Sequence, residues 1–144
     1  MLILRATSFL LLLATSSGCL ACVCDGPSLE KVLRAGGFVF VGRAVKGPAS
    51  HEPYPKVYTF EVIRVFNGFL TSRVRVQTFG GAMCGATFEV SRLYAVVPHP
   101  LPASDRSRLR GPAASWSARL CSGTTTVSSL ASVQAIGGPG QKPR

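Results

Sequence analysis

The sequence predicts an all-β fold with small helices, and three observations support this prediction. Most apolar segments are short runs of β-branched and aromatic residues in which apolar and polar side chains alternate, which is the period of a β-strand. Turn-forming Gly, Pro and Asn residues separate these runs. Only two stretches have the spacing or composition of a helix. We therefore expect one domain whose core is built from strands.

The first segment has the organisation of a secretory signal peptide. Residues 1–21 carry a positive charge at Arg5, continue with an apolar run and end in small residues before a cleavage site after Ala21. The apolar run is shorter than the roughly 20 residues that span a bilayer. We expect an exported protein without a transmembrane segment, secreted or held in the cell envelope, whose mature chain starts at Cys22.

A second processing route stays open. The segment 16–19 is distantly similar to a bacterial lipoprotein cleavage site, in which Cys19 would receive a lipid. That modification would leave Leu20 and Ala21 ahead of Cys22, and the amine of Cys22 would then be part of a peptide bond.

Without the leader, the chain is basic and carries four cysteines. Residues 22–144 contain 15 Lys and Arg against 6 Asp and Glu, a net charge of +9, because Arg5 is lost with the leader. An even number of cysteines in a small exported domain indicates two disulfides, and spacing alone allows three pairings. A structural zinc site is the alternative, but the sequence has no Cys-x-x-Cys pair and only His51 and His99 as further ligands. We expect no metal or cofactor of the protein's own.

The first expected element is a short helix over residues 28–35. Its apolar residues recur with helical spacing, Ser28 is a suitable N-cap, and the two glycines at 36–37 end it. After this helix the period of the pattern changes to two.

Two strands follow the helix. Residues 38–46 form a β-branched and aromatic run, and residues 57–66 alternate so that Tyr58 and Phe60 share one face. The segment 47–55, which contains three prolines, is expected to be the loop between them.

The second half of the chain continues the strand pattern. Asn67-Gly68 predicts a turn before the next strand. The further expected elements are strands at 73–79, 92–97 and 118–122, a long exposed loop at 98–115, a second helix at 124–136, and a disordered Gly-, Pro- and Lys-rich tail at 137–144.

Five short strands and two small helices in about 110 residues suggest a small closed β-barrel, and the oligonucleotide/oligosaccharide-binding (OB) type of barrel has this strand count. Composition alone does not distinguish such a barrel from a β-sandwich. The order of the motifs makes the distinction.

Short motifs follow one another along the chain in the order Cys22-Val23-Cys24, Pro27-Ser28-Leu29, Phe40-Val41-Gly42-Arg43, Tyr58-Thr59-Phe60-Glu61-Val62, Phe66-Asn67-Gly68, Cys84 in a glycine-rich loop, Tyr94 in a strand, and Cys121-Ser122-Gly123. In this order and spacing they resemble the tissue inhibitors of metalloproteinases and their short bacterial relatives, the netrin-like (NTR) module. The resemblance extends from Cys22 to about Leu130. It implies a five-stranded OB-fold-like closed barrel over residues 22–136, with a disulfide-linked N-terminus.

The resemblance also implies the disulfide pairing. In that family each cysteine of the Cys-x-Cys motif bonds to a distant cysteine. Carried over to this chain, the pairs are Cys22 with Cys84 and Cys24 with Cys121.

The function implied by the resemblance is inhibition of a metalloendopeptidase. The amine and carbonyl oxygen of Cys22 would chelate the catalytic zinc of the target protease, and Val23 would enter the adjacent pocket. Ala82 and Met83 would contact the protease beside them. The partner is then a zinc metalloprotease, bound by a monomer.

An exported barrel without inhibitory activity, acting as a structural or partner-binding module, is the alternative. Its candidate ligand is an anionic polysaccharide or an envelope surface, because basic residues cluster in one loop and on one strand face. These residues are Arg106, Arg108 and Arg110 in the loop, and Arg73 and Arg75 on the strand. Nucleic acid is not expected as a partner, because no exposed aromatic ladder accompanies the charge.

Nothing in the sequence indicates an enzyme. No Ser, Cys or carboxylate has a partner base at a recognisable catalytic spacing, and the mature cysteines are assigned to disulfides. His51 and His99 lie beside prolines in expected loops, so we expect both to be exposed. Trp116 is expected to pack on the barrel beside the strand that carries Cys121.

Overall fold

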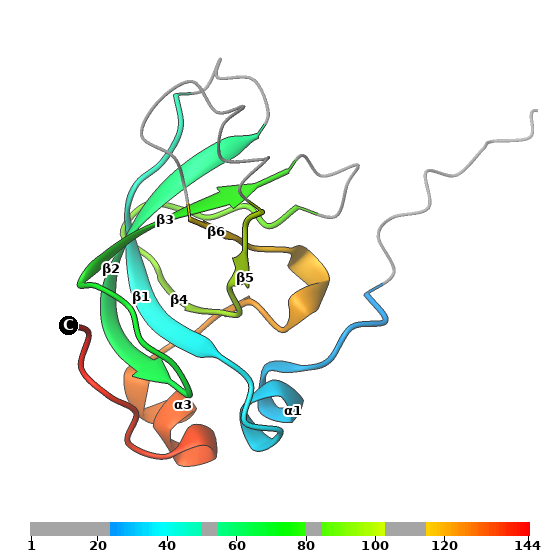
Figure 1. Cartoon of the computed structure of the whole chain (residues 1–144), viewed down its shortest axis with the longest axis vertical. Coiled ribbons are helices and arrows are strands. Elements are labelled where there is room, and N and C mark those ends of the chain that lie inside the picture. Colours follow the sequence, from blue (N-terminus) through cyan, green and yellow to red (C-terminus); the bar gives the residue numbers. More distant parts are fainter. Residues whose placement is uncertain (1–23, 50–54, 80–84, 103–114) are drawn as a thin grey trace, which may run out of the picture.

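The computed structural model describes residues 24–49, 55–79, 85–102 and 115–144. Strands dominate this part of the chain, and short helices accompany them (Figure 1). The elements in chain order are α1 (Leu29–Arg34), β1 (Val39–Lys46), β2 (Lys56–Phe66), β3 (Arg73–Thr78), β4 (Leu93–Val96), β5 (His99–Pro100), β6 (Trp116–Ser117), the 3₁₀ turn η2 (Leu120–Ser122), β7 (Thr125–Thr126) and α3 (Leu130–Gly137). The predicted class, mostly β with small helices, is confirmed.

The strands of the described chain form one curled sheet in the order β5-β6-β3-β2-β1-β4-β7. The long strands β1, β2 and β3 pair antiparallel at its centre, and β6 is parallel to β3. Only Val97 and Pro98 separate β4 from β5 along the chain, although these strands lie near opposite ends of the sheet order. The sheet therefore curls like half a barrel, as Figure 1 shows.

This arrangement differs from the expected closed barrel of five strands. The described residues contain seven strands, and no ladder between them joins β5 to β7. β5 has only two residues, and one of them, Pro100, has no backbone N–H to donate to a ladder. In the described residues the sheet is consequently open where a closed barrel would be continuous.

An aromatic cluster fills the concave side of the sheet. The ring of Phe60 meets those of Phe40, Phe88 and Tyr94 edge to face, at centroid distances of 5.6, 4.9 and 6.2 Å. These distances lie in the range in which aromatic pairs add to the stability gained from burial. The alternation predicted for residues 57–66 is confirmed, since Tyr58 and Phe60 both belong to this core.

A second apolar cluster covers the other face of β1. Val39 and Val41, which alternate with Phe40, pack with Leu33 of α1 and Val133 of α3. Both faces of β1 are therefore buried at this end, which explains its unbroken run of buried residues from Val39 to Gly42. Figure 1 shows the two helices together at one end of the sheet.

The boundaries of α1 follow the sequence prediction. The Oγ atom of Ser28 accepts a hydrogen bond from the N–H of Lys31 at 3.2 Å, which caps the first turn. Gly36, with φ +73°, ends the helix in the left-handed conformation that glycine adopts without strain.

Two predicted elements near the C-terminus are wrong in extent. In place of the strand expected at 118–122, the two-residue strand β6 ends at Ser117 and Leu120–Ser122 form the η2 turn, in which the Oγ atom of Ser122 donates to the carbonyl oxygen of Arg119 at 2.8 Å. The helix expected at 124–136 begins only at Leu130, because the β-branched Thr125–Thr126 pairs with β4.

The tail expected to be disordered is ordered. Gln141 and Val65 exchange backbone hydrogen bonds of 2.7 and 2.9 Å, and the N–H of Arg144 donates to the carbonyl oxygen of Leu70 at 2.9 Å. The guanidinium carbon of Arg144 lies 4.3 Å from the centroid of the Phe69 ring. The composition of the tail suggested disorder, but the backbone of Val65 in β2 and the carbonyl oxygen of Leu70 provide hydrogen-bond partners for it.

No helix of the described chain is long and apolar enough to cross a membrane.

Candidate functional site

A disulfide anchors the N-terminal end of the described chain. Cys24 and Cys121 are bonded, with a Cα–Cα distance of 4.9 Å. This pair is the one that the family resemblance implied. Gly26 lies flat against the same turn, because a Cβ atom at position 26 would overlap the carbonyl oxygen of Cys121. The segment that leaves Cys24 is therefore held by one covalent bond and one close backbone contact.

A second chain segment reaches the same corner. Gly85 forms an isolated bridge with Arg119, two residues before Cys121. Gly85 also approaches Phe79 so closely that a Cβ atom would overlap the carbonyl oxygen of Phe79. The two residues that flank segment 80–84 are thus adjacent, and they lie beside the turn that holds Cys24.

Several predicted site residues lie outside the described residues. They are the zinc-chelating Cys22, the protease-contacting Val23, Ala82 and Met83, the disulfide partner Cys84, and the loop residues Arg106, Arg108 and Arg110, together with Cys19 and His51. The structure places only the segments next to them.

The basic strand face is described. Arg73 and Arg43 are the two cross-strand neighbours of Glu61, on β3 and β1 respectively. Arg75 is the neighbour of Thr59 on the same face. The prediction that Arg73 and Arg75 share a face is confirmed. Sequence reasoning missed Arg43, because only the register of β1 against β2 brings it there.

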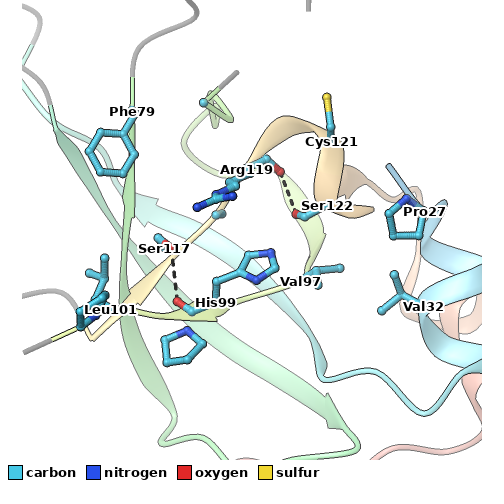
Figure 2. A pocket seen from close by; sticks show the side chains of 14 residues that line it. Pro27, Val32, Phe79, Val97, His99, Leu101, Ser117, Arg119, Cys121 and Ser122 are labelled. Carbon is cyan, nitrogen blue, oxygen red and sulfur yellow. Dashed lines mark hydrogen bonds between the residues drawn. The ribbon is translucent and has the colours of Figure 1, made fainter. Parts of the chain in front are cut away.

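A pocket of about 1030 Å³ opens beside the η2 turn (Figure 2). We call it the η2 pocket. Its walls are mainly apolar and include Pro27, Val32, Val97 and Leu101, and its polar side chains include His99 and Arg119. No sequence motif predicts this pocket, because its lining residues come from separate parts of the chain: α1 and the residues before it, the residue that follows β3, the segment 97–102 that includes β5, and the segment 117–122 that includes η2.

His99 is partly buried in β5, and the expectation of an exposed loop histidine is wrong. Its Nε2 atom is buried and has no hydrogen-bond partner among the described residues. Burial lowers the pKa of His99 from its usual value, and the positive charge of Arg119 lowers it further. Both effects favour the neutral form of the imidazole.

Arg119 is the only charged residue among those that line the η2 pocket in the described chain. Figure 2 shows its guanidinium group near the imidazole ring of His99. It has no carboxylate partner in the described part of the chain. The pocket therefore has one cation, one neutral imidazole and an apolar lining.

Trp116 lies where the sequence suggested, on the core and close to the segment that carries Cys121. Its ring meets that of Phe38 edge to face at a centroid distance of 5.3 Å. Partial burial against the inner cluster gives it a packing role.

Comparison with known proteins does not assign the chain to a family. The chain matches no protein-family model and no curated protein. Among the described residues, no three His, Cys, Asp or Glu side chains gather where they could hold a metal ion.

Proposed function

We propose that this protein is an exported inhibitor of zinc metalloproteases, built on an OB-type barrel, that binds the protease through its processed N-terminus. The observation that carries the proposal is the disulfide between Cys24 and Cys121, two residues after Cys22. A terminus tied to a folded domain so close to its end has little conformational freedom left to lose on binding.

The chemistry follows from a free amine at Cys22. An α-amino group has a pKa of roughly 7.7–8.0, so part of the population is neutral near pH 7 and can donate a lone pair to zinc. The carbonyl oxygen of the same residue would complete a five-membered chelate. A catalytic zinc keeps one position open for water or substrate, and the chelate would displace that water.

The position of Gly85, which follows segment 80–84, also supports the proposed inhibition. Gly85 pairs with Arg119, so the residue that follows Cys84 lies beside the turn that anchors Cys24. The proposal requires Ala82 and Met83 to contact the protease next to Val23. The short separation between Gly85 and the anchored turn is compatible with a shared contact surface.

Inhibition assays on material with a defined N-terminus test the proposal. Intact mass and N-terminal sequencing should give Cys22 as the first residue of exported protein. The native protein should inhibit members of a panel of zinc metalloproteases and leave serine proteases unaffected. If every zinc protease in the panel is indifferent to protein that starts at Cys22, the proposal is wrong.

Two variant pairs make the test specific. One Ala inserted before Cys22 should abolish inhibition, whereas one Ala added after Arg144 should not. Val23→Ala should weaken inhibition by about 10-fold, because two methyl groups leave the protease pocket. Val45→Ala, at a valine exposed on β1, should have no effect. All four variants should keep the thermal midpoint of the native protein within a few degrees.

A second candidate function is binding of an anionic polysaccharide on the outer face of β1–β3. The register that places Arg43 and Arg73 on either side of Glu61 favours it, since two cationic residues then share a face with one acidic residue. Arg43 is held in place by a hydrogen bond of 2.7 Å to the carbonyl oxygen of Ser91. Such a face attracts polyanions in a salt-dependent manner.

Retention on a heparin column distinguishes polyanion binding at this face from a nonspecific effect of the net positive charge. Replacing both Arg73 and Arg75 by Gln should lower the salt concentration at which the protein elutes. Replacing Lys31 and Lys142 by Gln removes the same charge from exposed positions elsewhere. Equal shifts in the two double variants would show that net charge alone governs retention.

A further inference from the structure

The η2 pocket has the chemistry of a ligand site that the proposed inhibition does not use. Its volume of about 1030 Å³ is at the upper end of the range of small-molecule sites. Most of its lining is apolar, which suits a hydrocarbon or aromatic body. A few convergent polar groups in an apolar pocket are the usual means by which such sites orient a ligand.

The polar groups of the pocket favour an anion. Arg119 supplies a guanidinium group, which matches the two oxygens of a carboxylate. No acidic residue lies among the described residues that line the pocket, so this charge is not neutralised there. A positive charge on an apolar wall attracts a ligand that carries one negative group and an apolar remainder.

His99 provides the second polar contact. A buried polar atom without a partner is costly to leave unsatisfied, and the Nε2 atom of His99 is such an atom among the described residues. In the neutral imidazole with its proton on Nε2, this atom donates a hydrogen bond. A small turn of the His99 ring would expose this atom to the pocket, and a carboxylate oxygen placed between it and Arg119 would then satisfy both groups.

From these contacts we infer that the η2 pocket binds a small organic monocarboxylate, with its carboxylate between His99 and Arg119 and its apolar body against Pro27, Val32 and Val97. The pocket is lined by residues of the packed domain, since Val32 and Val97 belong to the second apolar cluster and Leu101 and Ala118 are buried. The inference does not depend on protease inhibition.

Calorimetric titration of the full mature protein with three probes tests this inference. Octanoate has both parts of the ligand, octanamide has the same body without the charge, and acetate has the charge without the body. Octanoate should bind with a millimolar or lower dissociation constant. Octanamide and acetate should each bind at least 10-fold more weakly, since a charge-assisted hydrogen bond and an apolar body contribute separately.

Three variants assign the contacts. Arg119→Gln should weaken octanoate binding by about 10-fold or more, and His99→Phe, which keeps a ring but removes both nitrogens, should weaken it by several-fold. Lys142→Gln removes an equal charge from an exposed position that does not line the pocket, and it should leave binding unchanged. Circular dichroism of each variant confirms that the fold is kept.

Backbone amide shifts in an NMR titration locate the site. Octanoate should move the signals of Val97, Arg119 and Ser122 and leave those of β2 in place. The inference is overturned if octanoate does not bind at 10 mM, if octanamide binds as tightly, or if Arg119→Gln has no effect. The same variants should also be assayed for inhibition of a zinc protease. Because neither His99 nor Arg119 is expected to chelate the zinc of a protease, loss of octanoate binding and loss of inhibition can be told apart.

Discussion

Cys24 and Cys121 are bonded across 97 residues, and this bond closes nearly the whole described domain into one covalent loop. The loop begins just before α1 and ends in the η2 turn, so it encloses β1 to β6. Any change at either cysteine therefore acts both on the stability of the domain and on the position of the N-terminal segment.

Replacing both Cys24 and Cys121 by Ser should lower the free energy of unfolding by about 4.7 kcal/mol, as expected when a loop of roughly 100 residues is opened. Guanidinium denaturation at pH 7 measures this change. The double replacement avoids a free thiol. An unchanged denaturation midpoint would show that packing alone holds the N-terminal segment.

Gly26→Ala tests the close approach of the N-terminal segment to the turn. The added methyl group would overlap the carbonyl oxygen of Cys121, so one of the two backbones must move. We expect a loss of about 2 kcal/mol or more in the free energy of unfolding.

The matched control is Gly47→Ala. A Cβ atom at that position would lie 3.5 Å from the side chain of Tyr58, an ordinary van der Waals distance. This variant should stay within about 0.5 kcal/mol of the native protein. Equal effects of the two substitutions would contradict the assigned contact between Gly26 and Cys121.

Phe60→Ala tests the aromatic cluster. Phe60 is fully buried and contacts three other rings, so its removal should cost about 3–5 kcal/mol through lost burial and the cavity left behind. Phe69 is 60% exposed and makes a cation–π contact with Arg144. Phe69→Ala should cost only about 1 kcal/mol, and thermal denaturation compares the two variants.

His99 makes the stability of the protein depend on pH. Its folded pKa lies below the usual value of 6.5, first because of burial and then because of Arg119. The unfolded chain therefore binds a proton more readily than the folded chain, and stability should decrease as the pH falls below 6.5. Above pH 6.5 the contribution should be constant.

The His99→Phe variant should lose this part of the pH dependence. Chemical denaturation of both proteins between pH 5 and pH 8 measures the difference between them. The gap in the free energy of unfolding should change only on the acidic side. A parallel offset at all values of pH would show that His99 does not titrate differently in the folded chain.

Much of the local structure follows from adjacent residues. Ser28 and Gly36 set the ends of α1, and the alternation around Phe60 sets the inner face of β2, so both were predictable from the printed sequence. The η2 turn, which replaces the strand expected at 118–122, was not predictable, because Cys121 is bonded there to Cys24, 97 residues away. The ordered tail depends likewise on a distant partner, the backbone of Val65.

The candidate sites divide in the same way. That Arg73 and Arg75 share a face could be predicted from the sequence, because side chains two apart on a strand point the same way. The even number of cysteines likewise indicated disulfides. The position of Arg43 on that face, the opening of the sheet between β5 and β7, and the meeting of His99 and Arg119 in one pocket all depend on the folded arrangement. Periodicity and capping act over a few residues, whereas strand register and the curl of the sheet bring together groups that are far apart in the chain.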